Sequence, residues 1–174
     1  MAVRQIPWAD LGHLPQLLWH SWTRNRGNGG RPADLAITMR WKPGPAAHAA
    51  GPYMFSLTQF TPAKGTDVPA IWLAGTSLGD QLVRLDGAVG VTTYIRPGRD
   101  RQVGSLSVWS DPSGLEVFMA LPDHIEIMNK YRPRGLPVRS ATWWFGDLDV
   151  DAAVVRGIRL LDTHDDRRVT LHRT

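Results

Sequence analysis

The sequence predicts a single α+β domain in which an antiparallel sheet carries its helices on one face. Four runs of residues alternate in polarity or are rich in β-branched and aromatic side chains, which is typical of strands. Two longer segments between them place apolar residues at helical spacing. The resulting order is strand, helix, strand, strand, helix, strand. A chain of 174 residues, of which 43% are apolar, is long enough to bury one such core.

The first half of this order begins with a β-rich run from Tyr53 to Phe60. A segment with leucines at helical spacing follows from Val68 to Leu85, and a second β-rich run extends from Val89 to Arg96. The turn from Arg96 to Gln102 contains the proline and glycine that a hairpin loop favours. We therefore expect the second and third strands to form a hairpin.

The second half of the order contains the clearest local signals. Val103 to Trp109 alternates with the period of two that a strand requires. Asp111 can cap the next helix, because its carboxylate can accept a free backbone N–H and Pro112 suits the first turn. Pro122 predicts a kink or a restart of that helix. The run from Val138 to Phe145 supplies the last strand, which completes the βαββαβ pattern of a ferredoxin-like domain.

The chain divides into three predicted parts. Residues 1–52 form an N-terminal extension, with a short helix over Pro15–Arg24, a glycine-rich loop and an additional strand over Leu35–Trp41. Residues 53–146 form the ferredoxin-like domain. Residues 147–174 form an amphipathic helix and a charged tail.

Composition argues against several classes of function. The sequence has no cysteine, which rules out disulfides, thiolate metal sites and cysteine nucleophiles. Its net charge of +4 is spread over predicted loops without a long basic run, so no nucleic-acid partner is expected. Asp10 and His13 precede any sustained apolar run, so neither a secretion signal nor a membrane span is expected at the start. The resulting expectation is a cytoplasmic protein.

No metal site is expected either. The histidines and aspartates near the C-terminus match no compact ligand motif, and the arginines at 167 and 168 would oppose a bound cation. The residues concerned are His164, Asp165, Asp166 and His172. The sequence also lacks the fingerprints of a Rossmann domain, a P-loop and a zinc protease.

Strand alternation predicts a face suited to a ligand. If the helices cover the more apolar face, the opposite face carries small hydroxyls and large amphipathic rings, instead of the charged residues of a solvent face. Such a face can line a pocket, form a dimer interface, or do both. Its predicted members are Ser56, Thr58, Thr92, Tyr94, Ser105, Ser107, Trp109, Ser140, Thr142 and Trp144.

The run SLSVWSDPSGLEVF, the following DHIEIM segment, the closing WWF strand and the LVRLDGAVG turn resemble the dimeric α/β-barrel superfamily. This superfamily includes antibiotic-biosynthesis monooxygenase-like and spheroidene-monooxygenase-like proteins. The resemblance implies that two protomers, or a repeat within one chain, pair their open sheet faces around a cavity for an aromatic substrate or haem. It therefore implies a homodimeric, monooxygenase-type oxidoreductase of secondary metabolism that acts on a hydrophobic or aromatic small metabolite.

The candidate catalytic residues are His124, Tyr94 and Trp109. A neutral imidazole at His124 can move a proton or ligate iron, and Met128 lies on the same helix face at i, i+4, so these two residues are the candidates if haem is bound. An anionic group of a ligand could bind Arg132, Arg134 or Arg139. The candidate substrate-binding residues are Thr92, Ser105, Ser107, Thr142, Trp144 and Arg139.

Three further functions stay open at the level of sequence. A haem-binding oxidoreductase, a non-oxidative cyclase or isomerase, and a ligand-binding protein without catalysis all suit the same pocket. A serine hydrolase is raised by GTSLG, which fits the GxSxG elbow and would use Ser77 with Asp147 or Asp149 and His164. The segment around Ser77 also fits an ordinary helix with two tolerated glycines, which is the interpretation that we favour.

Overall fold

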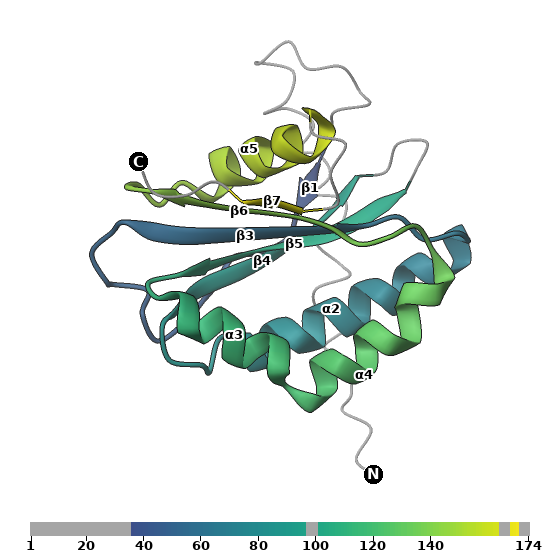
Figure 1. Cartoon of the computed structure of the whole chain (residues 1–174), viewed down its shortest axis with the longest axis horizontal. Coiled ribbons are helices and arrows are strands. Elements are labelled where there is room, and N and C mark those ends of the chain that lie inside the picture. Colours follow the sequence, from purple (N-terminus) through teal and green to yellow (C-terminus); the bar gives the residue numbers. More distant parts are fainter. Residues whose placement is uncertain (1–35, 97–100, 164–167, 171–174) are drawn as a thin grey trace.

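The structure, a computed structural model, describes residues 36–96, 101–163 and 168–170. A seven-stranded sheet runs through it in the order β1-β4-β5-β3-β6-β7, and β2 also pairs with β4 (Figure 1). All neighbouring strands are antiparallel except β6 and β7. The strands are β1 (Ile37–Thr38), β2 (Lys42–Pro43), β3 (Tyr53–Phe60), β4 (Ala88–Arg96), β5 (Gln102–Trp109), β6 (Arg139–Phe145) and β7 (Arg168–Thr170).

The predicted ferredoxin-like order is confirmed. Strands β3, β4, β5 and β6 are the four predicted strands, and the first and third of them lie at the centre of the sheet. The first helix follows β3 and the second helical segment follows β5, as the pattern requires. The helical elements are η3 (Gly65–Asp67), α2 (Val68–Leu82), α3 (Pro112–Ala120), α4 (Pro122–Tyr131), η4 (Arg132–Arg134) and α5 (Val150–Thr163).

The second helical segment begins and breaks where the sequence predicts. Asp111 Oδ1 accepts a hydrogen bond of 2.7 Å from the Ser113 backbone N–H, and Pro112 occupies the first turn of α3. Leu121 has an extended backbone, with φ −58° and ψ 135°, as expected for a residue before a proline. The helix therefore stops at Ala120 and restarts as α4 at Pro122.

The prediction that these helices cover the more apolar sheet face is wrong. Helices α2, α3 and α4 lie on the face that carries the small hydroxyls, and α5 covers the apolar face (Figure 1). The alternation of residues along the strands distinguishes the two faces of the sheet, but it does not determine which helices pack on each face. The apolar core that α5 completes consists of Phe55, Leu57, Val89, Tyr94, Leu106, Val108, Ala141 and Trp143 with Ala153, Val154, Ile158 and Leu161.

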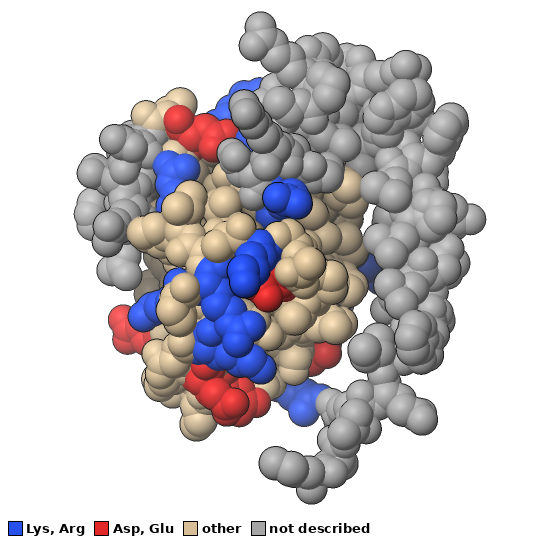
Figure 2. All heavy atoms as spheres, turned by 90° about the vertical axis from the view of Figure 1, so that its right-hand side faces the viewer, with Lys and Arg blue, Asp and Glu red and all other residues tan. Residues whose placement is uncertain are grey.

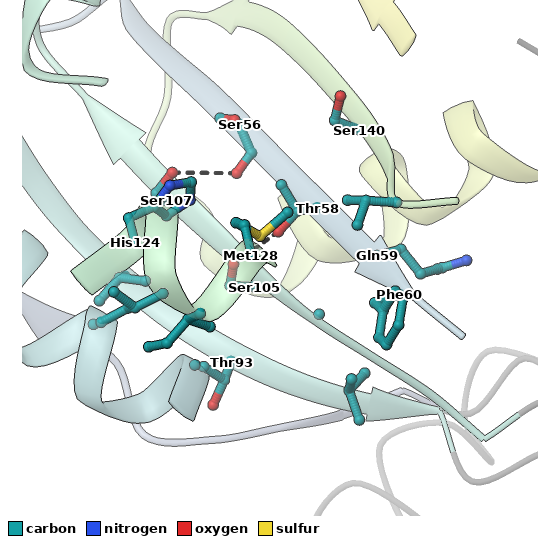
Figure 3. Close-up of a pocket in the computed structure, with 18 of the residues that line it drawn as sticks. Ser56, Thr58, Gln59, Phe60, Thr93, Ser105, Ser107, His124, Met128 and Ser140 are labelled. Atoms are coloured by element: carbon teal, nitrogen blue, oxygen red, sulfur yellow. Dashed lines mark hydrogen bonds between the residues drawn. The ribbon is translucent and has the colours of Figure 1, made fainter. Parts of the chain in front are cut away.

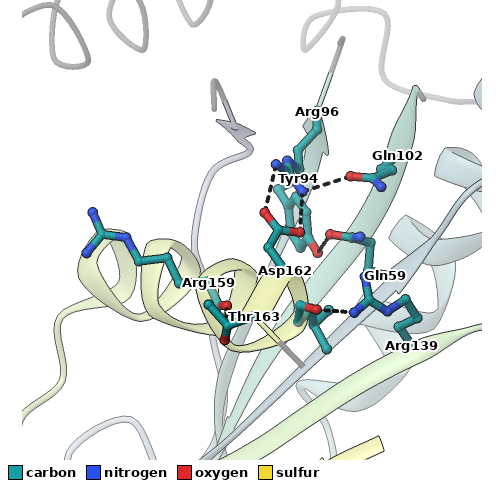
Figure 4. Close-up of polar contacts among 9 residues, drawn as sticks. Gln59, Tyr94, Arg96, Gln102, Arg139, Arg159, Asp162 and Thr163 are labelled. Atoms are coloured by element: carbon teal, nitrogen blue, oxygen red, sulfur yellow. Dashed lines mark hydrogen bonds and ion pairs between the residues drawn. The ribbon is translucent and has the colours of Figure 1, made fainter. Parts of the chain in front are cut away.

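Close packing and polar contacts hold α5 on the sheet. A Cβ atom on Gly157 would lie 2.7 Å from Leu57 Cδ1 and 2.8 Å from Trp143 Cη2, so only glycine permits this approach. At the end of the helix, Arg96 forms two contacts with Asp162, of 3.1 and 3.2 Å (Figure 4). The face through which the resemblance implies dimer formation is thus covered by the chain itself.

The predicted N-terminal extension contributes two short strands to this sheet. β1 and β2 both pair with β4, and the Trp41 ring lies directly over Gly90, where a Cβ atom would be 2.2 Å from Trp41 Cζ2. The predicted helix over 15–24 and the glycine-rich loop lie outside the described residues, as do His164 and His172. Over the ranges that the structure describes, no helix combines the length and apolar character needed to cross a membrane.

Candidate functional site

A cavity of about 410 Å³ lies between the sheet and helices α2, α3 and α4 (Figure 3). This volume is in the range of sites that bind drug-sized molecules, roughly 300–1,000 Å³. Its floor is formed by β3, β4, β5 and β6, and its roof is formed by the three helices. The cavity therefore has walls from both the sheet and the helices of one chain.

Hydroxyl side chains follow one another across the floor of the cavity in two adjacent rows of the sheet. The first row crosses four strands as Thr93, Ser105, Thr58 and Ser140. The second row crosses the same strands as Val91, Ser107, Ser56 and Thr142. All eight residues line the cavity.

Some of these hydroxyls are held by the protein, and others are available to a ligand. The Thr58 and Ser105 hydroxyls lie 3.0 Å apart, and the Ser107 hydroxyl donates to the Ser56 carbonyl at 3.3 Å. Among the described residues, the side chains of Ser140 and Thr142 have no hydrogen-bond partner. A ligand that carries oxygen atoms along one edge could pair with these free groups.

The roof is apolar, and two glycines give it room. Gly75 and Gly79 lie one turn apart on α2 and both line the cavity. A Cβ atom on Gly75 would have nothing within 4 Å, whereas one on Gly79 would lie 3.4 Å from Val91 Cγ1. Gly75 therefore faces the open space of the cavity.

The same segment overturns the hydrolase hypothesis. A nucleophile elbow requires a strand, a sharp turn and a helix, with the serine at the turn. Here all of GTSLG lies inside α2, and Ser77 is exposed on the helix face away from the cavity. Asp149 has a structural task instead, because its Oδ1 accepts from the Ala152 N–H at 2.9 Å at the start of α5.

His124 lies at one end of the cavity, in the first turn of α4. Its ring is 4.9 Å from the Phe118 ring, which is itself 6.2 Å from the ring of the buried Trp109. Burial lowers the pKa of His124, a hydrogen bond to the Met119 backbone opposes this effect, and the charge of Arg132 lowers the pKa further. The imidazole is therefore neutral at pH 7 and can accept a proton from a bound molecule.

Five of the predicted site residues are brought together in the cavity. His124 and Met128 line it from α4, and Ser105, Ser107 and Thr142 line it from the floor (Figure 3). Two predicted tryptophans, Trp109 and Trp144, pack just beyond one end of the cavity. Trp109 is fully buried and its Nε1–H donates to the Ser107 hydroxyl at 2.9 Å, so it supports the floor without lining the cavity.

Three further predicted site residues do not line the cavity. Tyr94 and Thr92 project to the α5 face of the sheet; the Tyr94 hydroxyl donates to the Thr58 carbonyl at 3.2 Å, and the Thr92 hydroxyl to the Met39 carbonyl at 2.9 Å. Burial raises the pKa of Tyr94, so its phenol stays protonated. Arg139 donates to the Leu161 carbonyl at the end of α5 (Figure 4). The reason is local: Thr92 and Thr93 are consecutive, so one hydroxyl falls on each face.

Sequence reasoning missed most of the helical roof. Gly75 and Gly79 were noticed only as part of an elbow motif, although their i, i+4 spacing could have indicated a helix face without side chains. Phe118 is absent from the predicted site, although it lines the cavity from α3. The remaining roof residues gave no signal that separates a cavity wall from a core: Ile71, Trp72, Leu78, Leu82, Leu115, Met119, Ile127 and Tyr131.

The lining does not fit haem. A haem carries two propionates, whereas Arg132 is the only cation among the described residues that line the cavity. The volume is also near the lower end of the range for small-molecule sites. Within the described ranges, no three His, Asp or Glu residues are grouped so that they could hold a metal ion.

The fold is that of the ferredoxin-like α+β proteins, here with a cavity between the sheet and the helices. No family model matches the sequence, and no curated protein matches it. The fold does match solved structures. A protein from Shewanella oneidensis is similar with a TM-score of 0.50 at 13% identity, covering 61% of this chain and 97% of that one.

Several of the similar structures have names that refer to oxygenation. A “Putative monooxygenase” from Fusobacterium nucleatum is similar with a TM-score of 0.52 at 7% identity, over 60% of this chain and 48% of that one. SnoaB, a cofactor-independent oxygenase from Streptomyces nogalater, is similar with a TM-score of 0.45 at 15% identity, over 57% of this chain and 97% of that one. At these identities the likeness shows the fold alone.

Proposed function

We propose that this chain is a monooxygenase-type oxidoreductase that binds a hydrophobic or aromatic small metabolite in the cavity beneath α2, α3 and α4. One observation carries the proposal: a cavity of about 410 Å³ combines an apolar roof, a floor with seven hydroxyl groups and one neutral histidine. Apolar walls supply binding free energy, while a few polar groups orient the ligand. The resemblance of the sequence to monooxygenase-like proteins supports oxidation as the reaction.

A reaction without a cofactor is balanced if the substrate is an electron-rich phenol. Molecular oxygen then places one oxygen atom on the ring, the second oxygen leaves as water, and the phenol becomes a quinone. The substrate supplies all four electrons that the oxygen accepts. Such a substrate must first lose its phenolic proton, because the phenolate is the better electron donor.

His124 is the residue that we assign to this proton. Its imidazole is neutral at pH 7 and can therefore accept a proton. Among the described residues that line the cavity, it is the side chain best suited to act as a general base. The Phe118 ring on one side and the hydrogen bond to the Met119 backbone restrict the ring's orientation. The hydroxyl rows on the floor would orient the oxygen-bearing edge of the substrate toward it.

The proposal is tested by oxygen uptake with a panel of electron-rich phenols, followed by mass spectrometry of products formed under ¹⁸O₂. We expect uptake, one labelled oxygen in the product, and at least about a hundredfold slower turnover in His124→Gln. Ser77→Ala, on the exposed side of α2, is the matched control and should behave as wild type. Substrate conversion without oxygen would indicate a cyclase or isomerase, and binding without conversion would indicate a ligand-binding protein; either result refutes the oxidative proposal.

A further inference from the structure

One end of the cavity is surrounded by cations. Arg132 lines the cavity from η4 and is also exposed, so it lies at the rim. Tyr131 beside it forms the end wall, and the charged groups of Lys130 and Arg134 lie 5.4 and 5.6 Å from the centre of its ring. Lys and Arg side chains gather on this side of the molecule (Figure 2).

Segments from two other elements bring further cations to the same rim. The Ala63 N–H donates to the Arg134 carbonyl at 2.8 Å, which places Lys64 next to η4. The guanidinium of Arg101 lies against Gly65, where a Cβ atom would be 2.4 Å from it. We call Lys64, Arg101, Lys130, Arg132 and Arg134 the basic rim.

The positive charge of the basic rim is largely uncompensated. Asp67 lies 3.8 Å from Arg134, which is the only ion pair that the described residues form with the rim. Arg132 in particular has no carboxylate within 4 Å among the described residues. Cations that serve only solubility are usually interspersed with acidic residues, whereas an unpaired arginine in a cavity wall can bind an anion.

Arg132 and His124 line the same cavity from one helical segment. His124 is in the first turn of α4 and Arg132 begins η4 directly after α4, and the charge of Arg132 lowers the pKa of His124.

We infer that the molecule bound in the cavity is an organic anion, with a carboxylate or similar acidic group held by Arg132 and an apolar body that extends toward His124. This inference rests on the proposed use of the cavity and adds a substrate class to it. Neutral analogues should bind more weakly.

The test uses two fluorescent probes of the same apolar shape, 8-anilino-1-naphthalenesulfonate, which is anionic, and N-phenyl-1-naphthylamine, which is neutral. With the full chain, we expect Arg132→Gln to raise the Kd of the anionic probe about tenfold and to leave the Kd of the neutral probe unchanged. Arg132→Lys should restore part of the loss. Arg159→Gln, an equal charge change on the exposed face of α5, should alter neither Kd.

Each adverse result has a distinct meaning. If Arg132→Gln raises the Kd of both probes equally, or raises neither Kd, the inference about the anion is wrong, while binding in the cavity stands. If the anionic probe still binds to Gly75→Leu, whose side chain fills the cavity, that probe binds elsewhere and the inference is also wrong. If the neutral probe does not bind to the wild type, the proposed function of the cavity fails as well.

Discussion

Replacing Gly75 tests whether the space beneath α2 is a binding site or a packing defect. A Cβ atom at this position would have no neighbour within 4 Å, so alanine meets no steric cost there. Glycine in a helix interior is less favourable than alanine by about 1 kcal/mol. We therefore expect Gly75→Ala to raise the free energy of unfolding by about 1 kcal/mol, equivalent to roughly 2–4 °C in Tm for a domain of this size.

Gly75→Leu separates stability from binding. The longer side chain enters the cavity and buries apolar atoms, so we expect stability at least equal to that of wild type and at least a tenfold loss in affinity for N-phenyl-1-naphthylamine. Urea unfolding gives the first quantity and fluorescence titration the second.

Gly79→Ala is the matched control for these variants. Its Cβ atom would lie 3.4 Å from Val91 Cγ1 on the cavity floor, so we expect a similar gain in helix stability and a smaller loss of affinity than in Gly75→Leu. The reasoning is refuted if Gly75→Ala is less stable than wild type, or if Gly75→Leu is stable and binds the probe as tightly as wild type does.

Three further predictions concern His124, α5 and assembly. Burial lowers the pKa of His124 below its ordinary value of 6.5, so the unfolded chain binds the proton more readily than the folded chain does. The free energy of unfolding and the rate of oxygen uptake should therefore both fall as the pH drops from about 7.5 to about 5. His124→Gln should flatten both pH profiles. Gly157→Ala should lower the free energy of unfolding by about 1–3 kcal/mol in urea titrations, because its Cβ atom would overlap Leu57 and Trp143; an unchanged midpoint would show that α5 is not so closely packed. Light scattering after gel filtration should give a mass of 19.4 kDa, because α5 covers the sheet face through which the resemblance implies pairing; twice that mass would refute the expected monomer.

The element order could be predicted because its signals are local. The cap at Asp111 and the break at Pro122 depend only on a carboxylate next to a free N–H and on the geometry of proline. These effects act over a few residues and do not depend on the rest of the fold. The same holds for His124, whose position in the helix after the break follows from the spacing.

The position of the cavity could not be predicted, because it depends on which helix covers which face. The C-terminal helix was expected from its apolar residues, but nothing in its sequence states that it takes the apolar face of the sheet. Once α5 lies there, Tyr94 and Arg139 contact it or the core beneath it, and the hydroxyl face is left to α2, α3 and α4. Basic side chains from three separate loops and helix ends likewise meet only in the folded chain.

The cover that α5 provides also changes how this face can vary. A sheet face that pairs with its own copy must be self-complementary, so each substitution is present on both sides of the interface. Here Trp143 contacts a helix of a different sequence, and a change on the sheet can be matched by a change at Gly157 alone. Docking within one chain also does not weaken on dilution. The packing of this sheet face therefore needs neither a self-complementary sequence nor a minimum protein concentration, both of which a face paired with its own copy requires.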